Sequence, residues 1–139
     1  MHLDLSWNCL RKDGATAIAN SLRLNRTLEV LDLNWNGFGI EGATGLARSL
    51  PVNTTLKVLD LTNNRLDWKA AQKLAPGLKK NKSLETLILN MNPLGEVGVD
   101  CVLKALNGHS TVKFLGLEVS TRVTTHCRRE KLTRAVFMS

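Results

Sequence analysis

Residues 28–36 read LEVLDLNWN, and this stretch returns as LKVLDLTNN at 56–64 and as LETLILNMN at 84–92. Partial copies stand at both ends, LDLSWN from position 3 and VKFLGLEVS from position 112. The copies begin at Leu28, Leu56 and Leu84, which defines a 28-residue repeat. The copies share the pattern L-x-x-L-x-L-x-x-N-x-L. The last partial copy breaks it, because Ser120 stands at the asparagine position. Self-similarity at a fixed period of about 20–50 residues is the signature of a repeat architecture.

The L-x-L core of each copy predicts a short strand whose two leucines point inward, because apolar residues alternate with period 2. The asparagines at 8, 36, 64 and 92 follow this strand, where the chain turns away. An asparagine amide can donate to and accept from turn backbone, and stacked copies can form a ladder. Loss of such a side chain would cost roughly 1–3 kcal/mol in unpaired backbone groups.

The second half of each copy predicts a helix, because apolar columns recur four residues apart on one face. Those columns contain Ile18, Leu46, Leu74 and Val102, then Leu22, Leu50, Leu78 and Leu106. Small residues open each helix and should let it approach the strand layer, namely Gly14, Gly42, Ala70 and Gly98. Pro76 should distort the last turn of the third helix. One strand and one helix per repeat predict a curved α/β solenoid over residues 1–118, with parallel strands on the concave face.

These repeats resemble the ribonuclease-inhibitor class of leucine-rich repeats, which includes ribonuclease inhibitor, the Ran GTPase-activating protein and NOD-like receptor sensors. The phrases LDLSWN at 3–8, LDLNWNGF at 31–38 and LNMNP at 89–93 are most similar to the leucine-rich-repeat-containing protein 74 group. The class resemblance implies a scaffold that binds other proteins. Resemblance to the Ran activator would imply GTPase stimulation, through a loop arginine such as Arg11 or Arg65.

Both ends of the repeat region lack the polar cap that a solenoid needs. Met1 stands two residues before an inward leucine, and nothing after Ser120 follows the repeat. We expect a truncated form, a splice product or a fragment of a longer array. Its first repeat should fray or pair with another chain, including a second copy.

The formal net charge is +7, of which +3 belongs to residues 1–118 and +4 to the non-repeat tail 119–139. The tail could form a basic amphipathic helix with Leu132 and Val136 on one face, be disordered, or dock on the last repeat. It brings no aromatic platform for bases, so nucleic acid and membrane are secondary hypotheses. Three scattered cysteines and the absence of a secretory signal favour a cytoplasmic protein, with the nucleus also open.

Three tempting motifs have a structural interpretation. Residues 37–42 form a G-x-G-x-x-G, but only Gly42 belongs to the repeat, and Asp60 falls in a repeat column. The sequons at Asn25, Asn53 and Asn81 also occupy one position of successive repeats and suit turns after helices. His109 stands in that same column, and no histidine forms a catalytic or metal cluster. We therefore expect no cofactor, no metal and no enzymatic activity.

The candidate binding surface is the concave face, where residues between and after the strand leucines should be exposed. Asp4, Asp32 and Asp60 would form a weak acidic stripe, with Trp7 and Trp35 stacked beside it. The other candidates are Asn34, Thr62, Asn63, Ile88, Asn90 and Met91. Exposed tryptophans are common interface hot spots, although these two could instead stack only on each other and stabilise the fold. Trp68 is expected in the loop before the third helix, packed locally.

The leading hypothesis is a non-enzymatic module that binds an unknown protein or peptide on this face. The alternatives are a regulator of a small GTPase or other enzyme, and binding of nucleic acid or membrane through the tail.

Overall fold

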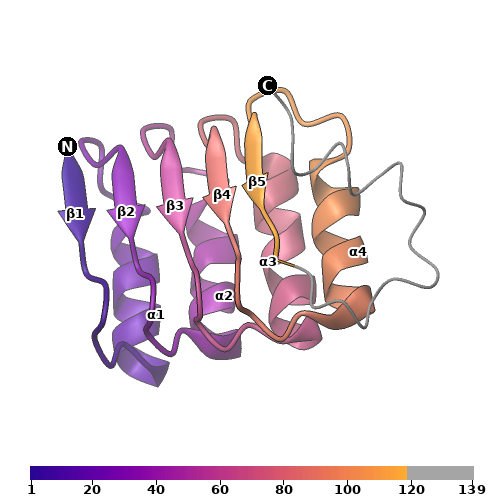
Figure 1. The fold of residues 1–139 in the computed structure, drawn as a ribbon. Coiled ribbons are helices and arrows are strands. Elements are labelled where there is room, and N and C mark those ends of the chain that lie inside the picture. The colour runs from indigo at the N-terminus through magenta and orange to yellow at the C-terminus, as the bar shows by residue number, and fades with distance from the viewer. Residues whose placement is uncertain (119–139) are drawn as a thin grey trace.

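The computed structural model describes residues 1–118, which form one parallel sheet backed by helices (Figure 1). The sheet has the order β1-β2-β3-β4-β5. Its strands are β1 (His2–Asp4), β2 (Val30–Asp32), β3 (Val58–Asp60), β4 (Thr86–Ile88) and β5 (Phe114–Gly116). All neighbours pair in parallel, and Leu3, Leu31, Leu59, Leu87 and Leu115 lie in register. The predicted 28-residue stacking is confirmed.

One helix follows each of the first four strands, and all four cover the same face of the sheet (Figure 1). They are α1 (Lys12–Ser21), α2 (Gly39–Ser49), α3 (Trp68–Lys80) and α4 (Gly95–Leu106). The predicted α/β solenoid is therefore correct. None of the helices described is long and apolar enough to cross a membrane. The predicted tail helix, His126 and Cys127 lie outside the described residues.

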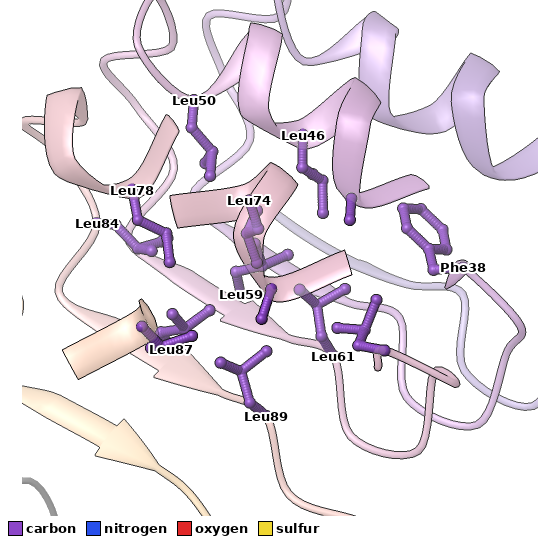
Figure 2. Packing of buried hydrophobic residues seen from close by; sticks show 14 of the residues in the cluster. Phe38, Leu46, Leu50, Leu59, Leu61, Leu74, Leu78, Leu84, Leu87 and Leu89 are labelled. Atoms are coloured by element: carbon purple, nitrogen blue, oxygen red, sulfur yellow. The ribbon is translucent and has the colours of Figure 1, made fainter. Parts of the chain in front are cut away.

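The core lies between the sheet and the helix layer, and the repeated leucines fill it (Figure 2). Leu59 and Leu61 from the β3 segment meet Leu74 and Leu78 from α3, and all four are at most 1% exposed. The expectation for the small helix residues needs correction. A Cβ added to Gly42 would lie 2.2 Å from the Phe38 ring, and one added to Gly98 would lie 3.1 Å from Trp68 Cα of α3, so these glycines make room for a core side chain and for the neighbouring helix rather than for a strand.

The asparagine ladder forms as predicted, and it connects successive repeats. Asn64 Nδ2 donates to Leu33 O at 2.8 Å in the preceding repeat and to Thr62 O at 3.0 Å in its own. Its Oδ1 accepts from Phe38 N at 3.3 Å. Asn36 and Asn92 make the corresponding bonds to Leu5 O and Leu61 O.

The sequon asparagines form a second ladder at the turns that follow the helices. Asn53 Nδ2 donates to Leu22 O at 2.8 Å, and Asn81 Nδ2 donates to Leu50 O at 2.7 Å. His109 Nε2 takes the same place against Leu78 O at 3.0 Å, which confirms its predicted turn role. Asn53 and Asn81 are each 1% exposed, so the folded chain shields both amides from glycosylation.

Pro76 does not end α3, which is the longest of the described helices and continues to Lys80. At the helix end Asn81 N donates to both Gly77 O and Leu78 O, each at 3.1 Å, so the last turn, which was expected to be distorted, combines an α-type and a 3₁₀-type hydrogen bond. Proline costs a helix the hydrogen bond to the carbonyl four residues earlier, and Pro76 stands on the exposed side of α3.

Candidate partner-binding face

The strand face is defined here as the non-leucine positions of the strands, on the side away from the helices, together with the residues that directly follow them, and all predicted site residues occupy these positions. The side chains of Asp4 and Asp32, Asn34 and Thr62, and Ile88 and Asn90 are exposed or half-buried there, between inward leucines. This alternation follows from the pleat, in which successive side chains point to opposite sides.

Trp7 and Trp35 stack on each other after β1 and β2. Their ring centroids are 4.3 Å apart and the ring planes differ by 5°. Trp7 is 70% exposed and Trp35 37% exposed. The predicted vertical pair is confirmed, and one broad face of the Trp7 ring is left open to solvent.

The backbone at this column is left-handed, which sequence reasoning missed. Trp7, Trp35, Asn63 and Met91 have φ values of 56°, 53°, 50° and 55°. The amides of the first three donate to the next repeat, at Asn34 O, Thr62 O and Asn90 O, so the repeat contacts fix this conformation. Asparagine adopts the left-handed region readily, whereas a bulky residue there is an outlier. In the sequence, the asparagine at position 63 was the one sign of a left-handed backbone in this column.

The acidic column has a structural task. Asp4, Asp32 and Asp60 each accept a hydrogen bond at Oδ1 from the backbone amide two residues later, at 2.8 to 2.9 Å. The side-chain and backbone hydrogen bonds from Ser6 hold the pKa of Asp4 below its ordinary value. Asp32 also accepts from Asn34 Nδ2 at 3.2 Å. These carboxylates mainly close the turns after the strands, as aspartate commonly does.

The remaining predicted residues lie at the other end of the strand face. Ile88 and Asn90 belong to the β4 segment, and Met91 is exposed beside them. Asn63 stands between Trp35 and Met91 in the left-handed column. The structure therefore stacks Trp7 on Trp35, joins Asp32 to Asn34 and Asp60 to Thr62 by hydrogen bonds, and spreads the candidates along four repeats.

The G-x-G-x-x-G segment contributes Phe38 and Gly42 to the interior, whereas Ile40 and Glu41 are exposed. Phe38 is fully buried, and a Cβ added to Gly42 would lie 2.2 Å from the Phe38 ring. Phe38 N and Gly39 N donate to Asn64, at Oδ1 and at the backbone oxygen. A phosphate loop needs free amides, and these two are already used.

The other singled-out side chains do not form a reactive cluster. Trp68 is the first residue of α3 and not part of the loop, and Lys69 Nζ lies 5.4 Å from its ring centroid. The stem of Arg11 covers Gly37, where an added Cβ would lie 2.7 Å from Arg11 Cγ. Arg65 is exposed with a φ of 58°. Among residues 1–118, no three His, Cys, Asp or Glu side chains gather as a metal site.

Comparison with known proteins agrees with this geometry. A family profile described as Leucine Rich repeat matches residues 1–19, 24–47, 52–75 and 80–103, which is more than half of the chain. The protein therefore belongs to the leucine-rich repeat family. Its fold is similar to the solved structure entitled "Leiomodin-1 Actin-Binding Site 2 (ABS2)", with a TM-score of 0.79 and 18% identity. The match covers 97% of this chain and 78% of that one, and at this identity it shows the fold alone. No curated protein matches the sequence.

Proposed function

We propose that this chain is a non-enzymatic interaction module that binds a protein or peptide on its strand face, with Trp7 and Trp35 as the main contact. The observation that carries the proposal is the exposed tryptophan pair. Tryptophans in a hydrophobic patch are the residues most often found to dominate binding free energy at protein interfaces. The rest of the strand face, from Asp32 to Met91, would extend this contact along the later repeats.

The magnitudes favour binding over a purely structural pair. A stacked aromatic pair contributes about 0.5–1.5 kcal/mol beyond its buried area. A left-handed non-glycine residue costs on the order of 1–3 kcal/mol, and this column holds two tryptophans in that conformation. Asparagine, as at position 63, would satisfy the same backbone at a smaller cost. The tryptophans are therefore poor choices for stability alone.

The test replaces both tryptophans by the residue that the third repeat already uses. Trp7→Asn with Trp35→Asn should leave the circular dichroism spectrum and the unfolding midpoint unchanged or slightly improved. Affinity purification with quantitative mass spectrometry should identify partners that the wild-type chain captures. The double variant should capture at least about tenfold less of them, because hot-spot tryptophans contribute about 2 kcal/mol or more.

Trp68→Ala is the matched control, because Trp68 is an exposed tryptophan on the helix side. Its capture profile should equal that of the wild-type chain. Equal capture of all partners by the double asparagine variant would refute the tryptophan pair as the contact surface.

Three narrower assignments belong with this proposal. The sequence phrases support kinship with the leucine-rich-repeat-containing protein 74 group, and the cysteine usage supports a cytoplasmic location.

Regulation of a small GTPase stays an alternative supported by class resemblance. A hydrolysis assay with the wild-type chain and Arg65→Ala tests it, and no stimulation removes it.

A further inference from the structure

A second surface lies at the edge of the solenoid where each helix ends and the chain turns into the next strand. This edge, here called the turn edge, consists of residues 20–29, 48–57, 76–85 and 104–113. The turns of successive repeats line up along the upper side of the molecule in Figure 1. They belong to neither the strand face nor the tryptophan pair.

Charge is strongly segregated to this edge. It carries nine basic and two acidic residues, whereas the rest of residues 1–118 carries five basic and nine acidic residues. The modest net charge of the repeat region therefore hides a basic edge of +7 and a remainder of −4. Adjacent helices pack about 8–10 Å apart, close to the Debye length at physiological salt, so charges of neighbouring repeats act together.

Most of these basic groups are available to a partner. Six exposed ones have no ion pair among the described residues: Arg23, Arg26, Arg48, Lys79, Lys80 and Lys82. Both acidic residues of the edge are already paired. Glu29 contacts the amino terminus at 3.4 Å, and Glu85 contacts Lys113 at 2.9 Å and Lys57 at 3.5 Å.

Exposed aliphatic side chains stand among these charges. Leu24 is 86% exposed and Val52, one repeat further on, is 45% exposed. Val52 has repeats on both sides and is still exposed, so its exposure does not depend on the end of the array. The edge contains no Phe, Trp or Tyr, which are the side chains on which nucleic-acid bases stack.

Basic residues also stabilise helix C-termini by interaction with the helix dipole. That effect falls off within the last turn, and Lys82 lies beyond the end of α3. Arg26, beyond the end of α1, also closes its own turn, because its Nη1 donates to Arg23 O at 2.9 Å and to Asn25 O at 3.0 Å. It also gives no reason for an exposed leucine or valine. The dipole therefore accounts for part of the charge and none of the aliphatic exposure.

We propose that the turn edge binds the surface of an anionic lipid bilayer, with the lysines and arginines facing lipid headgroups and Leu24 and Val52 entering the interface. Basic clusters attract acidic lipids, and a few apolar side chains at the same surface add interfacial insertion. This surface differs from the strand face, so a bilayer and a protein partner could be bound at the same time.

The test uses the full chain and sedimentation with vesicles of phosphatidylcholine alone or of equal parts phosphatidylcholine and phosphatidylserine. The wild-type chain should bind only the phosphatidylserine vesicles, and less at high salt. Lys79→Glu with Lys80→Glu should lower the partition coefficient about tenfold or more, because each basic residue near the surface contributes about a factor of five. Leu24→Ser with Val52→Ser should lower it several-fold.

Two matched controls carry the same charge change. Lys69→Glu with Lys73→Glu alters the other end of α3, and Arg128→Glu with Arg129→Glu alters the tail. Both control variants should keep the partition coefficient within about threefold of wild type, because they lose only the general attraction due to net positive charge. Native circular dichroism of each variant, and of the milder Lys79→Gln with Lys80→Gln, separates lost binding from lost folding.

Several results would overturn the proposal. No binding by the wild-type chain at low salt would do so. Equal losses for the three glutamate pairs would indicate diffuse attraction without a defined edge, and loss confined to the tail pair would assign the binding to residues 119–139. Unchanged vesicle binding after loss of both aliphatic side chains, with tighter binding of a DNA duplex than of vesicles, would favour nucleic acid.

Discussion

The first and third repeats carry nearly the same sequence pattern but have different surroundings. Leu3 is 37% exposed, whereas Leu59, in the same register of the sheet, is fully buried. Asn8 is exposed and donates only to Leu5 O and Ser6 O of its own turn. Asn64 is fully buried and bonds to the preceding repeat. A consensus residue therefore gains most of its stabilising contacts from the neighbouring repeat, as expected for a quasi-one-dimensional fold.

The leucine pair should give the largest contrast. Leu59→Ala removes a side chain packed on both sides and should lower the free energy of unfolding by about 3–5 kcal/mol. Leu3→Ala should cost about 1 kcal/mol or less, because part of its side chain is already in water. Urea unfolding followed by circular dichroism measures both. Similar losses at the two positions would mean that the first repeat is as well covered in solution as the third.

The asparagine pair should give a smaller contrast of the same sign. Asn64→Ala leaves Phe38 N without its partner inside the protein and leaves Leu33 O with only the bond from Asn36 Nδ2, and should cost about 2 kcal/mol. Asn8→Ala should change stability by less than about 0.5 kcal/mol, since water can replace its two bonds. Amide hydrogen exchange should show faster exchange at Phe38 in the Asn64 variant. Equal destabilisation by both variants would contradict a ladder that acts between repeats.

Much of the fold was predictable because the same positions recur five times. The leucine columns gave the strand register, and the asparagines gave the ladder. The contact between Trp7 and Trp35 also followed from their equivalent places in successive repeats. The helix continues past Pro76 because this exposed position accommodates the proline ring and the missing donor, and because α3 packs against a neighbouring helix on each side.

Two features of the surface could not be predicted from residue patterns read along the chain. The left-handed backbone at Trp7 and Trp35 is imposed by hydrogen bonds to the next repeat, and tryptophan itself gives no sign of it. The basic turn edge is invisible when charge is summed over residues 1–118. It appears only when residues are grouped by their place in the repeat, because groups at equivalent positions of successive repeats are neighbours in space.

The smallest expected effect concerns the charged column just before the strands, where Glu29, Lys57, Glu85 and Lys113 alternate. Hydrogen bonding and charge attraction from Lys113, followed by Lys57, hold the pKa of Glu85 below its ordinary value of 4.5. A carboxylate with a depressed folded-state pKa stabilises the fold above its unfolded-state pKa, and this contribution is lost as the pH falls through the folded value. Glu85→Gln should therefore be slightly less stable than wild type at pH 7, and the difference should shrink as the pH falls below the ordinary value of 4.5.

Thermal unfolding of both chains across this pH range measures the effect, and high salt should reduce it at pH 7 because the pair is solvent-exposed. Glu29→Gln is the matched control from the edge of the array. Its carboxylate meets only the amino terminus, at 3.4 Å, whereas Glu85 contacts lysines of the repeats on both sides. A larger loss of stability at Glu85 than at Glu29 would show that surface residues, like core residues, stabilise the fold more when repeats flank them on both sides. Equal losses would show that this dependence on neighbouring repeats holds only for the leucines and the asparagines.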